Sequence, residues 1–167
     1  LRNYNTALND FDRSIRLDPG QPLAYFNRGY LLFEMAEREY VENKYSGPVT
    51  ISWQGTGKEL PREIPLSPDY QKAMTDYDRV IELQPDNAFA YFNRGNVKVR
   101  LKDYNGAVQD YTLAISKEPG LAEAYFNRAL TLIFLNETQS ACRDLSLAGE
   151  LGLDLAYKVI KQYCKIP

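Results

Sequence analysis

The residue types that carry most enzyme chemistry are scarce in this chain. Its 167 residues include two cysteines and no histidine. Histidine is the commonest general base and metal ligand near neutral pH, and it completes most serine and cysteine nucleophile pairs. Two cysteines without histidine make a poor metal site. We therefore expect no catalytic residue, no metal and no cofactor, and we expect that the protein is not an enzyme.

One short segment resembles a phosphate-binding loop but has the wrong residues around it. Residues 55–58 read Gly-Thr-Gly-Lys. Ser52 stands where the phosphate loop requires a glycine, and Glu59 stands where it requires serine or threonine. Pro61 also prevents a helix from starting directly after the segment. The sequence therefore predicts no phosphate site here.

Composition and charge exclude several other classes of protein. Apolar residues make up 44% of the chain and charged residues 25%, which is typical of a folded domain rather than a disordered one. The net charge is −2 and no basic stripe stands out, so we expect no nucleic acid partner. No apolar run approaches the roughly 18 residues of a membrane span, so we expect none in this chain.

A string of five residues, Ala-Tyr-Phe-Asn-Arg, occurs three times, and its copies begin at Ala24, Ala90 and Ala124. The interval between the last two copies gives a period of about 34 residues, and the interval between the first two is nearly twice as long. A second string alternates with the first and has tyrosine, then alanine three residues later and proline fifteen residues later. It begins at Tyr4, Tyr70 and Tyr104. Such self-similarity at a fixed period is typical of a repeat architecture.

Each string has the pattern of an α-helix. Ala107, Tyr111 and Ala114 recur at spacings of four and three, which places an apolar stripe on one helix face. Pro119 then ends this helix. The unit is therefore two antiparallel helices joined by a short turn. One such unit cannot bury its apolar face alone, so the units must stack on one another.

These features resemble the tetratricopeptide repeat, which has the same period and the same order of aromatic residue, glycine, alanine, aromatic residue and proline. In the best-preserved unit these positions are Tyr91, Gly95, Ala107, Tyr111 and Pro119, and in the unit before it they are Tyr25, Gly29, Ala73, Tyr77 and Pro85. Two departures are an arginine (Arg28, Arg94, Arg128) where the family usually has leucine, and Ala129 in place of the last glycine. The resemblance implies an all-α, antiparallel helix-pair solenoid, the tetratricopeptide superhelix.

The repeats divide residues 1–167 into the parts of a single domain. We predict a trailing half-repeat at 1–21, an interrupted repeat at 22–87, regular repeats at 88–121 and 122–153, and a capping helix at 154–167. The first of these is the second helix of a repeat without its partner, so we expect the chain to be the C-terminal part of a longer array. Lys158 and Lys161 give the last helix the polar outer face that a terminal unit needs.

The extra residues of the longer interval lie between the two helices of one unit, at about 37–68. They begin with a charged continuation of the helix through Glu42. Val49, Ile51 and Trp53 then alternate with polar residues, which predicts a small β-hairpin, with an ordered loop as the alternative. Trp53, the one tryptophan of the chain, either anchors a partner or pins the insertion to its own solenoid.

The resemblance also implies where a partner binds, because the first helix of each repeat lines the concave surface in this family. Helical geometry then turns asparagine and phenylalanine side chains toward the groove, where amides suit a peptide backbone and aromatic rings supply contact area. The alternative is that the phenylalanines pack within the array and the asparagines brace neighbouring helices. The candidate groove residues are Phe26, Asn27, Tyr30, Phe92, Asn93, Asn96, Arg100, Phe126 and Asn127.

One branch of the family clamps the terminal carboxylate of a peptide with lysine, asparagine and arginine. In this chain the asparagines match that pattern, whereas Leu23, Phe89 and Glu123 occupy one set of cation positions and phenylalanine occupies another. Arg100 is the one cation at the groove edge. We therefore expect a neutral or apolar segment rather than a carboxylate tail.

The three arginines that replace leucine recur together with three aspartates. We predict a structural ladder of ion pairs between neighbouring repeats, in which each aspartate lies about half a period before its arginine. The expected pairs are Asp10 with Arg28, Asp76 with Arg94, and Asp110 with Arg128. Such partly buried pairs set the register of the repeats more than they stabilise the fold.

Cys142 and Cys164 lie at matching distances on either side of a turn at Gly152, so antiparallel helices bring them close. The pair is either a disulfide or two thiols, and we favour thiols.

As a whole, the sequence predicts a protein–protein interaction module, a scaffold or adaptor that binds another protein in its groove or through the insertion. The alternative is self-association into a homo-oligomer through the unpaired first helix, whose apolar face carries Leu8, Phe11 and Ile15.

Overall fold

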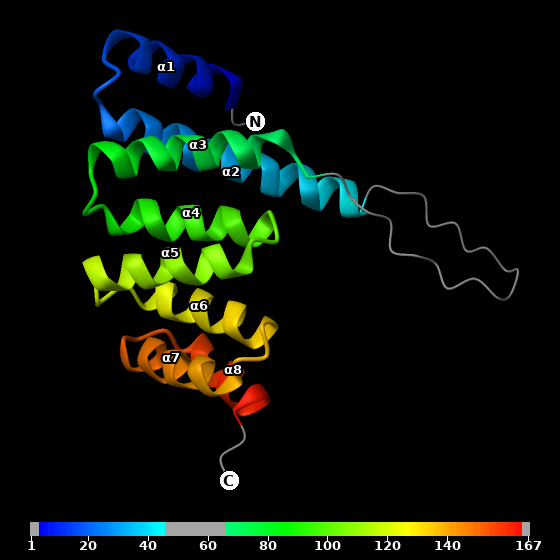
Figure 1. Cartoon of the computed structure of the whole chain (residues 1–167). Helices are drawn as coiled ribbons and strands as arrows, with labels where there is room; N and C mark the ends of the chain where they lie inside the picture. The colour runs from blue at the N-terminus through cyan, green and yellow to red at the C-terminus, as the bar shows by residue number, and fades with distance from the viewer. Residues whose placement is uncertain (1–3, 46–65, 165–167) are drawn as a thin grey trace, which may run out of the picture.

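The computed structural model describes residues 4–45 and 66–164, and within these ranges the chain forms eight α-helices and no strand. Each helix packs on the next, and the stack runs in chain order from one end of the molecule to the other (Figure 1). The predicted all-α solenoid of helix pairs is confirmed. The helices are α1 (Tyr4–Leu17), α2 (Pro22–Tyr45), α3 (Pro68–Leu83), α4 (Ala88–Arg100), α5 (Tyr104–Lys117), α6 (Ala122–Phe134), α7 (Thr138–Glu150) and α8 (Leu155–Tyr163).

The turns inside the helix pairs repeat along with the sequence. Lys102 follows α4 with φ of 63°, and Asn136 follows α6 with φ of 64°. A residue in this left-handed region lets the following N–H groups bond the last carbonyls of the helix. Asp103 accordingly donates its N–H to the carbonyl of Lys98 at 2.9 Å. These turns send α5 back along α4 and α7 back along α6.

Small residues allow the paired helices to approach closely. Gly95 of α4 faces the ring of Tyr111 of α5, and a Cβ on Gly95 would lie 2.7 Å from Cε1 of that ring. Gly29 has the same place in α2 but more room, because its nearest atom would be Cβ of Asp76 at 3.2 Å. Tyr77 and Tyr111 are almost fully buried at these contacts. The core is therefore a series of similar helix contacts rather than one central cluster.

The last helix covers the end of the array and is held to it covalently. Ala156 of α8 is fully buried against α7, and a half-buried disulfide joins Cys142 to Cys164 with their Cα atoms 5.8 Å apart. Our preference for two thiols was therefore wrong. The antiparallel packing of α7 and α8 brings the two side chains within bonding reach, as the sequence spacing suggested.

The structure shows how the insertion begins. Helix α2 does not stop where α4 and α6 do but continues through Glu37 to Tyr45, and its end projects beyond the other helices (Figure 1). The charged helical continuation predicted from the sequence is therefore correct. The predicted β-hairpin and Trp53 lie outside the described residues.

Candidate functional site

The first helices of the repeats, α2, α4 and α6, line a shallow pocket of about 300 Å³. Phe33 reaches it from α2, and Leu130, which is exposed, reaches it from α6. The other lining residues come from α4, α5 and α6 and are Asn96, Val99, Arg100, Tyr111, Asn127 and Thr131. The structure thus brings together three of the predicted groove residues, namely Asn96, Arg100 and Asn127.

A hydrogen-bonded cluster of two amides and a phenol forms the polar part of this groove pocket. Asn127 donates its Nδ2 to Oδ1 of Asn96 at 2.9 Å, and the hydroxyl of Tyr111 donates to the same oxygen at 2.8 Å. Burial raises the pKa of Tyr111, so this hydroxyl keeps its proton and remains a donor. Because Asn96 Oδ1 accepts both bonds, its Nδ2 group is the part of this amide that is left to donate to a ligand.

The groove phenylalanines contact the second helices of their repeats. Phe26 packs edge-on against Tyr77 with ring centroids 5.9 Å apart, and Phe92 lies 6.0 Å from Tyr111. All three groove phenylalanines, Phe126 included, are half-buried. They therefore serve the packing of the array and leave only part of each ring to the surface. Tyr30, by contrast, is 52% exposed.

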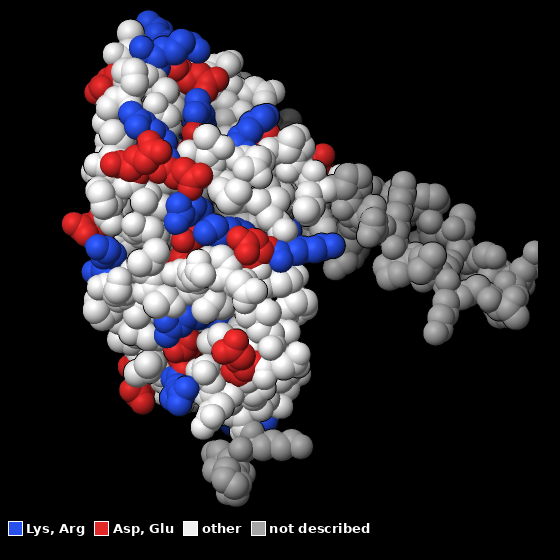
Figure 2. Space-filling model, in the orientation of Figure 1, with Lys and Arg blue, Asp and Glu red and all other residues white. Residues whose placement is uncertain are grey.

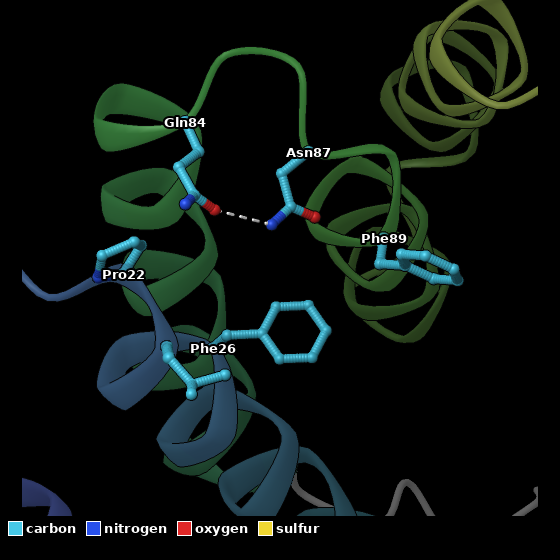
Figure 3. A pocket seen from close by; sticks show the side chains of 6 residues that line it. Pro22, Phe26, Gln84, Asn87 and Phe89 are labelled. Atoms are coloured by element: carbon cyan, nitrogen blue, oxygen red, sulfur yellow. Dashed lines mark hydrogen bonds between the residues drawn. The ribbon is translucent and has the colours of Figure 1, made fainter.

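A second pocket, of about 260 Å³, lies where α2 meets the turn between α3 and α4. Figure 3 shows the ring of Phe26 pointing from α2 toward the start of α4, with the hydrogen-bonded amides of Gln84 and Asn87 above it. Leu23 and Phe89 complete the lining and are both more than half exposed. The lining carries no charged side chain, in agreement with the absence of the family's cations at Leu23 and Phe89.

Arg100, the cation of the groove pocket, is paired with a residue that the sequence did not single out. Its Nη2 donates to Oε2 of Glu37, and the hydroxyl of Tyr70 donates to Oε1 of the same carboxylate at 2.7 Å. Burial, together with this hydrogen bond, raises the pKa of Tyr70. The sequence signal that could have pointed to Glu37 was the predicted helical continuation of α2. This continuation carries Glu37 past the position where α4 and α6 end.

The arginine ladder exists, but we predicted the wrong partners for it. Arg94 donates from Nε and Nη2 to the buried Asp110 of its own repeat, at 2.8 and 2.7 Å, and not to Asp76. In the same way Arg28 binds Asp76 rather than Asp10, and Arg128 binds Asp144 rather than Asp110.

The physical reason is the connection inside a repeat. Each arginine faces the second helix of its own pair, whose aspartate lies 16 residues later in the regular repeats. The link to the preceding repeat is made by Nη1, which donates to Asp12 from Arg28, to Asp78 from Arg94 and to Thr112 from Arg128.

These arginines are held on several sides. Each guanidinium lies 5.5–5.8 Å from the ring of a tyrosine three residues earlier, which is Tyr25, Tyr91 or Tyr125. The hydrogen bonds that Arg28 donates to Asp76 raise the pKa of Arg28, and those that Arg94 donates to Asp110 raise the pKa of Arg94. The ladder is therefore a charged structural network. Figure 2 shows basic and acidic side chains interspersed along one face of the molecule, without a large area of either sign.

Two further features bear on function. Among the described residues there is no cluster of histidine, cysteine, aspartate or glutamate that could hold a metal ion. None of the described helices is both long and apolar enough to cross a membrane.

Comparison with known proteins identifies the repeats. A model described as TPR repeat matches residues 69–102, and one described as tetratricopeptide repeat matches residues 90–119. The human mitochondrial import receptor subunit TOM70 (Homo sapiens) is 30% identical over 116 residues, which is 61% of this chain and 18% of the human protein. The chain thus spans less than a fifth of this relative.

Solved structures share the fold. MamA 41-end from Desulfovibrio magneticus RS-1 superposes with a TM-score of 0.67 at 18% identity and covers 90% of this chain and 67% of its own. The TPR2B domain of yeast Sti1, solved as a pHsp70 complex, has a TM-score of 0.50 at 26% identity and covers 56% of this chain and 75% of its own. The two matching models thus identify tetratricopeptide repeats within residues 69–119, and the solved structures show that the chain shares the solenoid fold of such repeats.

Proposed function

We propose that this chain is a protein-interaction module that binds a segment of another protein in the groove formed by α2, α4 and α6, and that it catalyses no reaction. The observation that carries the proposal is the amide cluster of Asn96 and Asn127 in the groove pocket of about 300 Å³. The complex of the Sti1 domain supports binding of a partner protein as the role of the fold.

The groove offers what an extended peptide requires. Asn96 presents Nδ2 as a donor, and Asn127, whose Nδ2 is turned to Asn96, presents Oδ1 as an acceptor. These two groups match a carbonyl and an N–H of a peptide backbone. Phe33, Val99 and Leu130 form apolar walls for the side chains of the segment.

The test is affinity capture of partners from a lysate of the source cells, with the native chain and with a variant in which Asn93, Asn96 and Asn127 are all changed to Ala. A matched control changes three exposed asparagines of the second helices, Asn5, Asn9 and Asn105, to Ala. Circular dichroism verifies that each chain is folded. We expect the groove variant to lose proteins that the native chain and the control both retain. Identical sets of retained proteins for all three chains would remove the groove as the binding surface.

Self-association through α1 is a second candidate role. No residue of α1 is fully buried, whereas each of the equivalent helices α3, α5 and α7 has five buried residues. Leu8, Phe11 and Ile15 therefore keep part of their apolar surface exposed. This role predicts a mass that rises with concentration in sedimentation and falls back to the monomer when Phe11 is changed to Ser. A monomer at all concentrations would exclude it.

A further inference from the structure

The long α2 helix places an acidic side chain where the other repeats have a turn. Helices α4 and α6 have 13 residues each, whereas α2 has 24. The residues that correspond to Glu37 by the repeat spacing are Asp103 and Glu137, and both stand at the N-cap of the next helix. Because α2 continues as a helix, Glu37 instead lies beside Arg100 of the following repeat.

The contacts of Glu37 hold its carboxylate beside Arg100, which lines the groove pocket. Both oxygens are engaged, one by Arg100 and the other by the hydroxyl of Tyr70. The side chain of Glu37 is 23% exposed and that of Arg100 is 44% exposed, so the pair lies at the edge of the pocket rather than beneath it. Arg100 is the one charged residue in the lining of this pocket. Its charge is balanced by a carboxylate of the chain itself.

We propose that Glu37 determines the specificity of the groove: by occupying Arg100 it makes the groove select uncharged peptide segments and reject segments that bring a carboxylate. This inference rests on the proposed function and names the chemistry of the partner. A ligand carboxylate would have to displace Glu37 from Arg100 or remain unpaired beside its negative charge, and both are unfavourable. An uncharged segment leaves the pair intact and uses the amides of Asn96 and Asn127 alone.

The variant Glu37→Gln tests this role with little change in shape. Glutamine keeps an oxygen that accepts from Tyr70 but removes the negative charge, so that Arg100 is free to bind an added carboxylate. Glu37→Gln combined with Arg100→Gln removes the cation as well. Glu39→Gln is the matched control, because Glu39 is exposed on the same helix and its replacement changes the net charge equally.

The experiment exposes each immobilised chain to a synthetic library of random hexapeptides, in which half of the molecules end in a free carboxylate and half in an amide. Retained peptides are counted by mass spectrometry, and circular dichroism establishes that the variants are folded. We expect the native chain and Glu39→Gln to prefer amides about tenfold or more, as the loss of one charge-assisted hydrogen bond implies. Glu37→Gln should shift that ratio about tenfold or more toward carboxylates. The double variant should lose this shift toward carboxylates, because no cation is left to bind them.

The outcomes separate this inference from the proposed function. In one outcome the triple asparagine variant abolishes the retention of peptides, but Glu37→Gln leaves the ratio of carboxylates to amides unchanged. This outcome overturns the role of Glu37 and leaves the proposed function standing. The same holds if the native chain retains carboxylates as well as amides, or if the shift persists in the double variant. Retention by the native chain that the triple asparagine variant does not reduce overturns the groove as the binding site, and the role of Glu37 with it.

Discussion

Removing the ladder arginines one at a time should destabilise the array unequally, because their aspartates differ in what else they contact. Asp76 and Asp144 are buried, and among the described residues each has one cation, Arg28 and Arg128 respectively. Asp110 is equally buried but also pairs with Lys98 Nζ at 2.8 Å, in addition to Arg94. Only Asp110 therefore keeps a cation when its arginine is lost.

The magnitudes follow from the cost of an uncompensated buried charge. Breaking a buried ion pair from one side typically costs about 3–5 kcal/mol. We expect Arg28→Met and Arg128→Met to approach that range, reduced by the partial exposure of the two arginines. Arg94→Met should cost about half as much, roughly 1–2 kcal/mol, because Lys98 still compensates Asp110.

Urea denaturation followed by far-UV circular dichroism at pH 7 measures these losses as shifts of the midpoint. The design places the mild variant, Arg94→Met, between two severe ones along the array, so position in the solenoid cannot produce the predicted order. Adding Asp144→Asn to Arg128→Met should recover part of the loss, since the unpaired charge is then absent. Equal losses for the three arginines, or the largest loss for Arg94, would refute the reasoning.

Three other predictions address packing, the cap and pH. Gly95→Ala should destabilise the array by about 1–3 kcal/mol, since its Cβ meets a buried ring at 2.7 Å, whereas Gly29→Ala should be nearly neutral in the same urea assay; similar midpoints would contradict this. Changing Cys142 and Cys164 to Ser should lower the free energy of unfolding by about 3 kcal/mol, and hydrogen exchange of the backbone amides should increase first in α8. Unchanged exchange in α8 would show that the disulfide does not hold this helix to the array. Burial raises the folded-state pKa of Tyr111, so the folded chain holds this proton more tightly than the unfolded chain does. The stability that this provides is present below about pH 10 and is lost as the pH rises further. A urea midpoint that stays constant between pH 9 and about 11.5 would argue against it.

The repeat spacing allowed most of the fold to be predicted, because a period of about 34 residues with proline-ended helices leaves few other arrangements. The same periodicity made the ion-pair register ambiguous. Asp76 precedes Arg94 and Asp110 follows it at nearly the same interval, and these two aspartates are one period apart, so the sequence supports both pairings equally. The structure distinguishes the two pairings, because Arg94 packs against α5, the second helix of its own repeat, and therefore pairs with Asp110.

The candidate site could be predicted only in part. Asn96 and Asn127 were found because helical geometry assigns faces within a repeat. Glu37 was missed because its contact with Arg100 joins residues 63 apart in the sequence and depends on how far α2 continues. The spacing of the two cysteines could not distinguish a disulfide from two thiols, since antiparallel helices bring the side chains close in either case.

The central claim is that partners bind the groove side of the array, and a photo-crosslinker placed at single positions tests it most directly. Leu130 lines the groove pocket on α6, and Leu113 lies on the second helix α5; each is 41% exposed, so the two sites are matched in residue type and accessibility. Benzoylphenylalanine at Leu130 should form adducts with a partner protein on irradiation, while the same group at Leu113 should not. Adducts from Leu113 alone would contradict the account.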